Sequence, residues 1–211
     1  MGWTAERGAG KAVIPSKRAL LLAALVVCAL PAIPRVSAQS RRPIPAGRVA
    51  SGLLSFDGHA TVGDFTGTTT TVTGEIKPAS DLAGVQGWVE APVQSLKTGD
   101  GKRDKDLNKS MESKKYPTMR FVLERIAPAG SGEAAVPVIL HGALSIHGVT
   151  RTVELPATIR FEQASARVRT DFPLNLKDYD IGGLSKMLGM LKMNENIEVH
   201  VNLVFQGKTP G

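Results

Sequence analysis

The side chains that could do acid–base or metal chemistry are few and widely spaced in this 211-residue chain. Its four histidines are His59, His141, His147 and His200, and they form no i,i+4 pair and no motif with acids at metal-ligand spacing. His141 and His147 are an even number of residues apart in one alternating segment, so we expect both on its exposed polar face. The pattern predicts no metal site and no cofactor.

Motifs for nucleophilic catalysis and for nucleotide binding are also missing from the sequence. The chain has no G-x-S-x-G turn, and Lys97-Thr98-Gly99 matches the K-T-G motif of penicillin-binding proteins without its S-x-x-K partner. No glycine-rich loop opens a predicted helix, so the sequence indicates no phosphate cradle. We therefore predict a binding protein and not an enzyme. A hydrolase whose site has no recognisable motif is a further alternative to the two binding functions given below.

The most heavily charged stretch is residues 95–121. Within it, residues 100–108 predict a short surface helix, because they are too polar to bury and place Leu107 four residues before Met111. Arg103 with a neighbouring lysine could bind an anionic lipid headgroup through bidentate contacts. Alternatively, Arg103 and Asp104 could bond the loop backbone and fix this stretch to the fold. Acids beside Arg103 would repel an anion, so we favour the structural role.

The rest of the chain reads as strands. Two segments, residues 151–162 and 196–206, alternate apolar and polar residues most regularly, and residues 68–76, mostly threonine, do so least. Tight turns such as His147-Gly148-Val149 favour an antiparallel barrel or sandwich. The eight predicted strands are residues 48–56, 68–76, 84–94, 119–126, 136–147, 151–162, 164–173 and 196–206.

Two connections, residues 96–117 and 174–195, are too long to be turns. In an up-and-down barrel both follow odd-numbered strands, so both should lie at one end, together with the loops 57–67 and 148–150. We take this end as the mouth. The second connection is expected to be helical, because apolar residues recur at helical spacing at Leu184, Met187, Leu188 and Leu191.

Several residues are predicted at the mouth. Methionines there could form an adaptable apolar lid, with ordinary helix packing as the alternative, and Tyr116-Pro117 also reads as the start of a strand. The predicted mouth residues are Arg103, Asp104, Met111, Tyr116 and Met187.

Small residues recur on the faces that should point inward. A closed sheet of about eight strands has an interior that side chains fill or that holds one slender ligand, and small residues in mid-strand favour the ligand. The alternative is a solid core in which large neighbours fill the gaps. The residues predicted to line the lumen are Gly87, Val89, Ala91, Phe121, Leu140, Gly142, Leu144, Ala157, Ile159, Val168, Thr170, Val199 and Val201.

The first 38 residues have the form of a signal peptide. Basic residues precede an apolar run from Ala19 to Leu30, and Val36-Ser37-Ala38 resembles a cleavage site. The run is shorter than the roughly 20 residues needed to span a bilayer. The only cysteine, Cys28, lies inside it. We predict a cleavable signal peptide at 1–38, a Pro-rich leader at 39–47 and a domain at 48–207, and hence a periplasmic or secreted protein without a stable membrane span.

The charge of the chain does not indicate nucleic-acid binding. The formal net charge is +7, but residues 1–38 contain five Lys or Arg and one acid, which leaves +3 for residues 39–211. The remaining basic residues gather between Lys97 and Lys115 and alternate with acids, as on a solvated face.

Three groups of residues carry a resemblance to the YceI-like family, secreted bacterial proteins that hold polyisoprenoid lipids inside a β-barrel. Ser95-Leu96-Lys97-Thr98-Gly99 through Tyr116-Pro117-Thr118-Met119-Arg120-Phe121 resembles the family signature. The run Gly142 to Arg151 resembles its G-x-L-x-I-x-G-V-x-[RK] hairpin, and Phe172 to Ile181 resembles its penultimate strand and the following turn. The family often has paired aromatic residues shortly before Tyr116, where this chain has Ser110 to Ser113.

The residues and the resemblance together predict an all-β fold: an antiparallel, lipocalin-like eight-stranded barrel with one short helix and one helical loop excursion. The expected function is to bind a long-chain isoprenoid or similar apolar lipid in the lumen, as an exported carrier or sequestering protein. A secreted stress-response or protein-interaction module with a solid barrel is the alternative.

Overall fold

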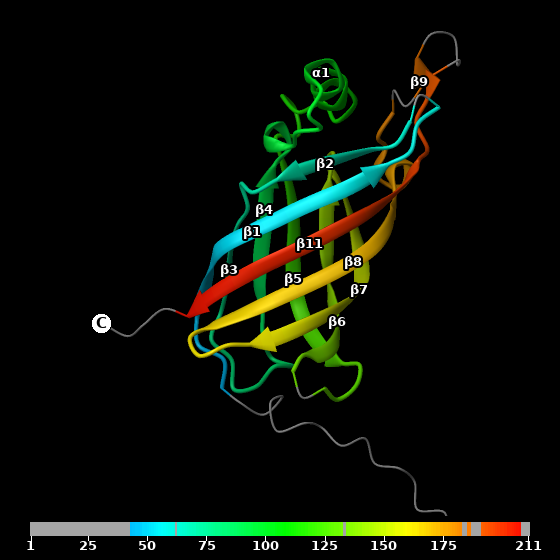
Figure 1. The fold of residues 1–211 in the computed structure, drawn as a ribbon. Coiled ribbons are helices and arrows are strands. Elements are labelled where there is room, and N and C mark those ends of the chain that lie inside the picture. The colour runs from blue at the N-terminus through cyan, green and yellow to red at the C-terminus, as the bar shows by residue number, and fades with distance from the viewer. Residues whose placement is uncertain (1–42, 62, 133, 183–184, 187–190, 208–211) are drawn as a thin grey trace, which may run out of the picture. The chain divides into compact units, whose positions relative to one another are not determined.

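A computed structural model describes residues 43–61, 63–132, 134–182, 185–186 and 191–207 of the chain. The predicted signal peptide lies outside these residues. Most of them form one antiparallel sheet (Figure 1). Its strands are β1 (Gly47–Gly58), β2 (Phe65–Thr69), β3 (Thr73–Ile76), β4 (Gly87–Pro92), β5 (Thr118–Pro128), β6 (Val136–Ile146), β7 (Val149–Phe161), β8 (Ser165–Asn175) and β11 (Asn196–Gly207).

The sheet closes on itself as a barrel. The strand order is β11-β8-β7-β6-β5-β4-β3-β1-β2, and a further pairing joins β11 to β1. Since β2 and β3 both pair with β1 and follow one another along the chain, they act as one interrupted strand, and the barrel has eight strands. The predicted all-β, lipocalin-like barrel is thereby confirmed.

Alternation of side chains sets the register of the long strands. Strand β6 is buried at every second residue from Val136 to Ile146, and β11 pairs with β8 without a break from Asn196 to Gln206. A shift by one residue would turn the apolar face of such a strand outward. The core therefore lies inside the ring of strands.

The predicted strand 68–76 is interrupted at residues 70–72. The Thr69 hydroxyl accepts a hydrogen bond from the Thr71 amide at 3.0 Å, and the Val72 amide donates to the Thr70 carbonyl at 3.0 Å. Threonine hydroxyls offer the backbone a local partner that competes with the strand ladder. The break turns Val72 into the core, where it is 8% exposed.

The first long connection contains the predicted surface helix. After a 3₁₀ turn, η2 (Val93–Ser95), helix α1 (Gly101–Ser110) begins at its N-cap, Asp100. The Asp100 carboxylate accepts hydrogen bonds from the backbone amides of Lys102 and Arg103 at 2.8 and 2.9 Å. A capping aspartate satisfies amides that have no partner within the helix, so this residue fixes where α1 starts.

The second long connection contains no α-helix where the structure describes it, which corrects the predicted helical excursion around residues 184–191. A 3₁₀ turn, η3 (Leu176–Tyr179), is followed by a two-stranded antiparallel ribbon of β9 (Ser185–Lys186) and β10 (Leu191–Lys192). Short apolar runs fit a hairpin as well as a helix. An isolated antiparallel bridge between Ala60 and Met193 joins this connection to the one that follows β1. The predicted mouth residue Met187 lies outside the described residues.

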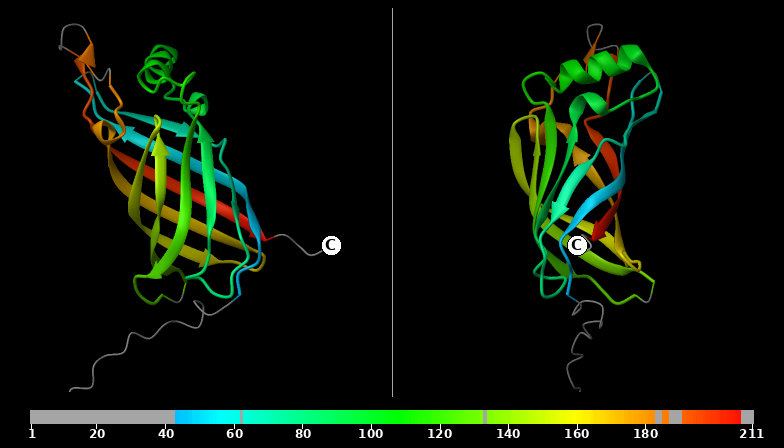
Figure 2. Two further views of the ribbon diagram at one scale, coloured as in Figure 1. Left: turned by 180° about the vertical axis from the view of Figure 1, so that it is seen from behind. Right: turned by 90° about the vertical axis from the view of Figure 1, so that its left-hand side faces the viewer.

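The connections predicted to form the mouth lie at one end of the barrel. Figures 1 and 2 show α1 and the β9–β10 ribbon at the same end, beyond the strands. Contacts join the connections there: the Asn194 amide donates to the His59 carbonyl at 2.7 Å, and Nδ1 of His147 lies 3.1 Å from the Tyr179 carbonyl. All four connections expected at this end are therefore found together.

Candidate lipid-binding lumen

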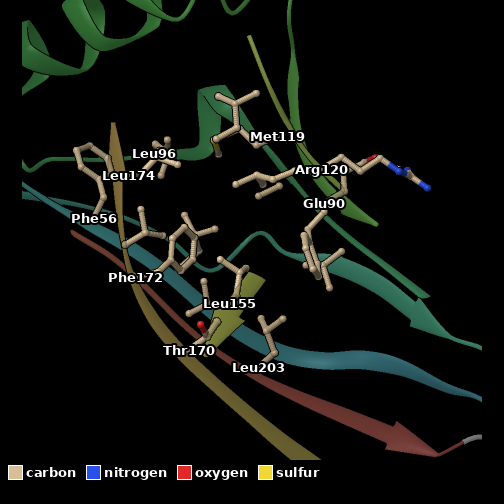
Figure 3. Close-up of a pocket in the computed structure, with 18 of the residues that line it drawn as sticks. Phe56, Glu90, Leu96, Met119, Arg120, Leu155, Thr170, Phe172, Leu174 and Leu203 are labelled. Atoms are coloured by element: carbon tan, nitrogen blue, oxygen red, sulfur yellow. The ribbon is translucent and has the colours of Figure 1, made fainter. Parts of the chain in front are cut away.

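The interior of the barrel is hollow. A cavity of about 470 Å³ runs inside it and opens at the end that carries α1. Ligand sites in proteins measure about 300–1,000 Å³, with mostly apolar walls and a few polar groups. The walls here fit that description, since aliphatic and aromatic side chains from every long strand line them (Figure 3).

Most of the residues predicted to line the lumen do line this cavity. They come from β4, β5, β6, β7, β8 and β11, on the face of each strand that borders the cavity. The lining residues from the predicted set are Gly87, Val89, Ala91, Phe121, Leu140, Leu144, Ile159, Val168, Thr170, Val199 and Val201.

Two predicted lumen residues, Gly142 and Ala157, do not line the cavity. A Cβ atom added to Gly142 would lie 2.8 Å from Cζ of Phe121, so the ring of that residue occupies the space that the glycine leaves. Ala157 is 7% exposed and belongs to the packed core. Gly87 does line the cavity, but a Cβ there would collide with the Glu75 carbonyl of β3. These small residues allow close packing of the wall and do not by themselves create the space.

Larger side chains missed by the prediction form much of the wall. Most of them stand on the same alternating faces, so the alternation could have found them. Phe65 could not be found that way, because it lies in a segment expected to be a loop. The missed lining residues include Leu54, Phe56, Phe65, Leu96, Met119, Leu155, Phe172, Leu174, Leu203 and Phe205.

Three polar residues in the wall between the strands, Thr170, Arg120 and Glu90, already have partners within the protein. The hydroxyl of Thr170, which is 6% exposed, donates to the Pro156 carbonyl at 2.7 Å. Arg120 pairs with Glu90 at 2.8 Å and lies over the Trp88 ring at 4.4 Å, and Figure 3 shows its side chain directed away from the cavity. The lumen therefore favours a ligand with few polar groups, because none of these partners is free to bond it.

Arg103 lies at the mouth over an aromatic pair. Its guanidinium is 4.5 Å from the centroid of the Phe65 ring, and Phe65 meets Phe56 edge-on at 6.0 Å. All three residues line the cavity, as does Met111 from the end of α1. Arginine on an aromatic face is a stabilising contact, which supports the structural role expected for Arg103.

Asp104 contacts the loop before α1 and does not line the cavity. Its carboxylate accepts hydrogen bonds from the amide and the hydroxyl of Thr98, both at 2.8 Å, and lies 3.8 Å from the Lys97 ammonium. The hydrogen bonds from Thr98 are the main reason that the pKa of Asp104 is lowered. Asp104 therefore ties α1 to the preceding loop, as the structural alternative predicted.

Tyr116 also lies at the mouth end without lining the cavity. Its ring is 4.6 Å from the ring of His147 and covers Gly148, where a φ of +80° and the closeness of the tyrosine ring both require glycine. The side chain of His147 is only 9% exposed and that of His141 is 14% exposed, so the prediction that both are exposed was wrong. Nδ1 of His147 donates to the Tyr179 carbonyl, which joins three connections of the mouth.

His200 forms a clamp across three strands on the outside of the barrel. Its ring nitrogens lie 2.6 Å from a carboxylate oxygen of Asp171 on β8 and 3.2 Å from one of Asp57 on β1. The hydrogen bond with Asp171 is the main reason that the pKa of His200 is raised. A hydrogen bond from Thr66 is the main reason that the pKa of Asp57 is lowered. Within the described ranges, no three His, Cys, Asp or Glu side chains are grouped to hold a metal ion.

The closed antiparallel ring, with an apolar lumen open at one end, defines a barrel of the ligand-binding class. The chain belongs to the YceI-like family, since residues 50–205 match the YceI-like domain. The fold of this family is that of a binding protein rather than an enzyme. A comparison with curated proteins gives no match.

Solved structures with the same fold come from several bacteria. BcnA of Burkholderia cenocepacia is 22% identical with a TM-score of 0.62, over 72% of this chain and 95% of that one. A polyisoprenoid-binding domain from Saccharophagus degradans is 16% identical with a TM-score of 0.66, over 78% of this chain and 100% of that one. The YceI protein of Campylobacter jejuni is 16% identical with a TM-score of 0.54, over 68% and 85%. Among the described residues, no helix is long and apolar enough to cross a membrane.

Proposed function

We propose that this protein binds a long apolar lipid of the polyisoprenoid type in the lumen of its barrel, as an exported carrier or sequestering protein that acts by binding and not by catalysis. The observation that carries the proposal is the hollow, apolar lumen with one open end. Membership of the YceI-like family and the likeness to a polyisoprenoid-binding domain support it.

The lumen offers enough apolar contact for a stable complex. Transfer of a chain from water into apolar surroundings gains about 0.8 kcal/mol per buried CH₂, so ten enclosed carbons contribute on the order of 8 kcal/mol before ordering costs. Thr170, Arg120 and Glu90 already have partners in the protein, so they do not require hydrogen bonds from the ligand. An unbranched or isoprenoid chain matches this lumen better than a ligand with many hydrogen-bonding groups.

The cavity also bears on the alternative of a solid interaction module. In a solid barrel, the inward faces of β8 and β11 would touch those of the opposite wall and leave no space between them. Here Thr170 and Val201, which face each other in neighbouring strands, both border the cavity. The hollow interior favours the carrier over the solid module.

Export is part of the proposal. The sequence of residues 1–38 supports it by its basic start, apolar run and small-residue cleavage site. Protein recovered from outside the cytoplasm should begin near Gln39. N-terminal sequencing that starts at Met1 would contradict export.

Mass spectrometry of the co-purified lipid tests the function. Native spectra of protein purified after export should show one stoichiometric adduct, and the organic extract should contain a chain with the repeat mass of isoprene units. Delipidated protein should take up an added polyprenol. A protein that carries no lipid and takes up none would leave the interaction module as the better explanation.

A further inference from the structure

Helix α1 lies across the end of the barrel, at the mouth of the cavity (Figure 2). Two of its faces are occupied by the protein itself. Leu107 and Met111 line the cavity, and Asp104 is bonded to Thr98 in the preceding loop. The remaining face meets solvent.

Three lysines, Lys102, Lys105 and Lys109, occupy this solvent-facing side, which we call the lysine face. Lys102 stands at its edge and also borders the mouth of the cavity. Their spacing of i, i+3 and i+7 confines them to an arc of about 60° on an α-helix, and all three are exposed. None of them forms an ion pair with another described residue. Asp106, which borders the arc, is engaged in an interaction of its own.

The carboxylates of Asp100 and Asp104 form hydrogen bonds away from the lysine face. Asp100 accepts hydrogen bonds from the first amides of the helix, which are the main reason that its pKa is lowered. Its charge also faces the positive end of the helix dipole. Asp104 is bonded to Thr98 in the preceding loop. The arrangement leaves a mainly positive strip beside the opening, which the exposed Lys114 extends beyond the end of α1. Lys115 is paired there with Glu112 at 3.7 Å.

We propose that the lysine face docks the mouth of the barrel onto a lipid bilayer that contains anionic headgroups. The inference rests on the proposed function, because a carrier of an apolar chain must load from a membrane, and exposure of the chain to water is unfavourable in proportion to its length. Docking at the rim places the opening against the bilayer surface. The chain can then move between the bilayer and the lumen with little contact with water.

The size of the attraction follows from the charge. Each basic residue near an anionic bilayer strengthens membrane partitioning by about fivefold, so three lysines together contribute on the order of a hundredfold. The attraction falls off over a Debye length of about 10 Å at 0.1 M salt. Docking should therefore require anionic lipid and should disappear at high salt.

Vesicle sedimentation with delipidated protein, purified after export, tests the docking. The probes are vesicles of phosphatidylcholine alone and of phosphatidylcholine with phosphatidylglycerol, at low and high salt. Wild-type protein should sediment only with the anionic vesicles at low salt. The triple variant Lys102→Gln, Lys105→Gln, Lys109→Gln should bind them on the order of a hundredfold more weakly.

A matched control removes the same charge elsewhere. Lys77, Arg160 and Arg169 are exposed positions away from the mouth, and the variant Lys77→Gln, Arg160→Gln, Arg169→Gln should bind anionic vesicles within a few fold of wild type. All three proteins have the same N-terminal residues before Pro43, so any contribution of that segment cancels.

Two results would overturn the docking. In the first, wild-type protein does not bind anionic vesicles, which would leave an acidic protein as the partner of the lysine face. In the second, the two triple variants lose the same amount of affinity for anionic vesicles. Uptake of polyprenol in detergent is measured separately. If that uptake fails while vesicle binding holds, the proposed ligand is wrong and the docking stands.

Discussion

The lumen and the rim of the barrel are held by different forces. The lumen is a wall of aliphatic and aromatic side chains whose contacts have no preferred direction. At the rim, directional contacts hold the connections, as in the bonds of Asp104 to Thr98 and the stacking of Arg103 on Phe65. The difference suggests that the lumen selects a ligand by length and apolarity, whereas the rim keeps the opening in shape.

A bulky residue in the lumen should have the largest effect on binding. Val201 lines the cavity in the middle of β11, so Val201→Trp should fill the lumen and lower polyprenol affinity by more than a hundredfold, since several CH₂ groups lose their place at about 0.8 kcal/mol each. The melting temperature of the delipidated protein should change little. The control is Val204→Trp, on the outer face of the same strand. Equal affinity in both variants would place the ligand outside the lumen.

The same enlargement outside the cavity should change stability instead. Ala157 is buried but does not border the open space, so Ala157→Phe should lower the free energy of unfolding by about 1–3 kcal/mol through overpacking. Urea unfolding measures the change, with Thr158→Phe on the exposed face as control. Unchanged stability would show that the cavity extends behind this residue.

Arg103 tests the rim. Loss of its contact with Phe65 in Arg103→Ala should lower the free energy of unfolding by about 0.5–1 kcal/mol, and the polyprenol affinity of the folded protein should stay within a few fold of wild type. Thermal unfolding and a binding titration measure the two effects. The opposite result, an unchanged melting curve with affinity lost at least tenfold, would mean that Arg103 binds the headgroup.

The smallest effect is expected outside both regions, at His200. Its pKa is raised in the folded protein, mainly by the bond to Asp171, so its stabilising contribution is full below about pH 6.5 and is lost as the pH rises through the folded value. The His200 side chain is 39% exposed, and solvent screening keeps the contribution below about 1 kcal/mol. The free energy of unfolding should therefore fall slightly from pH 6 to pH 8, measured with urea. His200→Gln should remove this slope, and an equal slope in the variant would assign it to another group.

The barrel and α1 could be predicted from the sequence, because the residues within each segment carry the pattern that defines it. Strand β6 is buried at every second residue without exception, and β11 alternates in the same way except at the half-buried Val201. Asp100 marks the helix start by its side-chain chemistry. Position along a strand tells which face a residue occupies. It does not tell whether a neighbour fills the space in front of it, as Phe121 does at Gly142.

Other features depended on contacts between distant segments. The β9–β10 ribbon was mistaken for a helix because pairing across the hairpin overrides a weak helical spacing. Phe65 enters the lumen only because β2 starts earlier than the threonine-rich pattern indicated. The burial of His147 follows from its turn folding beneath Tyr116, a residue 31 positions away.

The break between β2 and β3 leaves part of β1 without backbone pairing on one side. We call this line in the barrel wall the seam. Strand β1 pairs with β11 along its length, but with β2 only from Leu54 onward and with β3 only up to Arg48. Between these points Val72 packs against Gly52 in place of a second ladder. Parting this seam breaks side-chain contacts and few backbone hydrogen bonds, so it requires less free energy than parting β6 from β7, which pair over eleven residues. We infer that the barrel is easier to deform along this line than around the rest of its circumference.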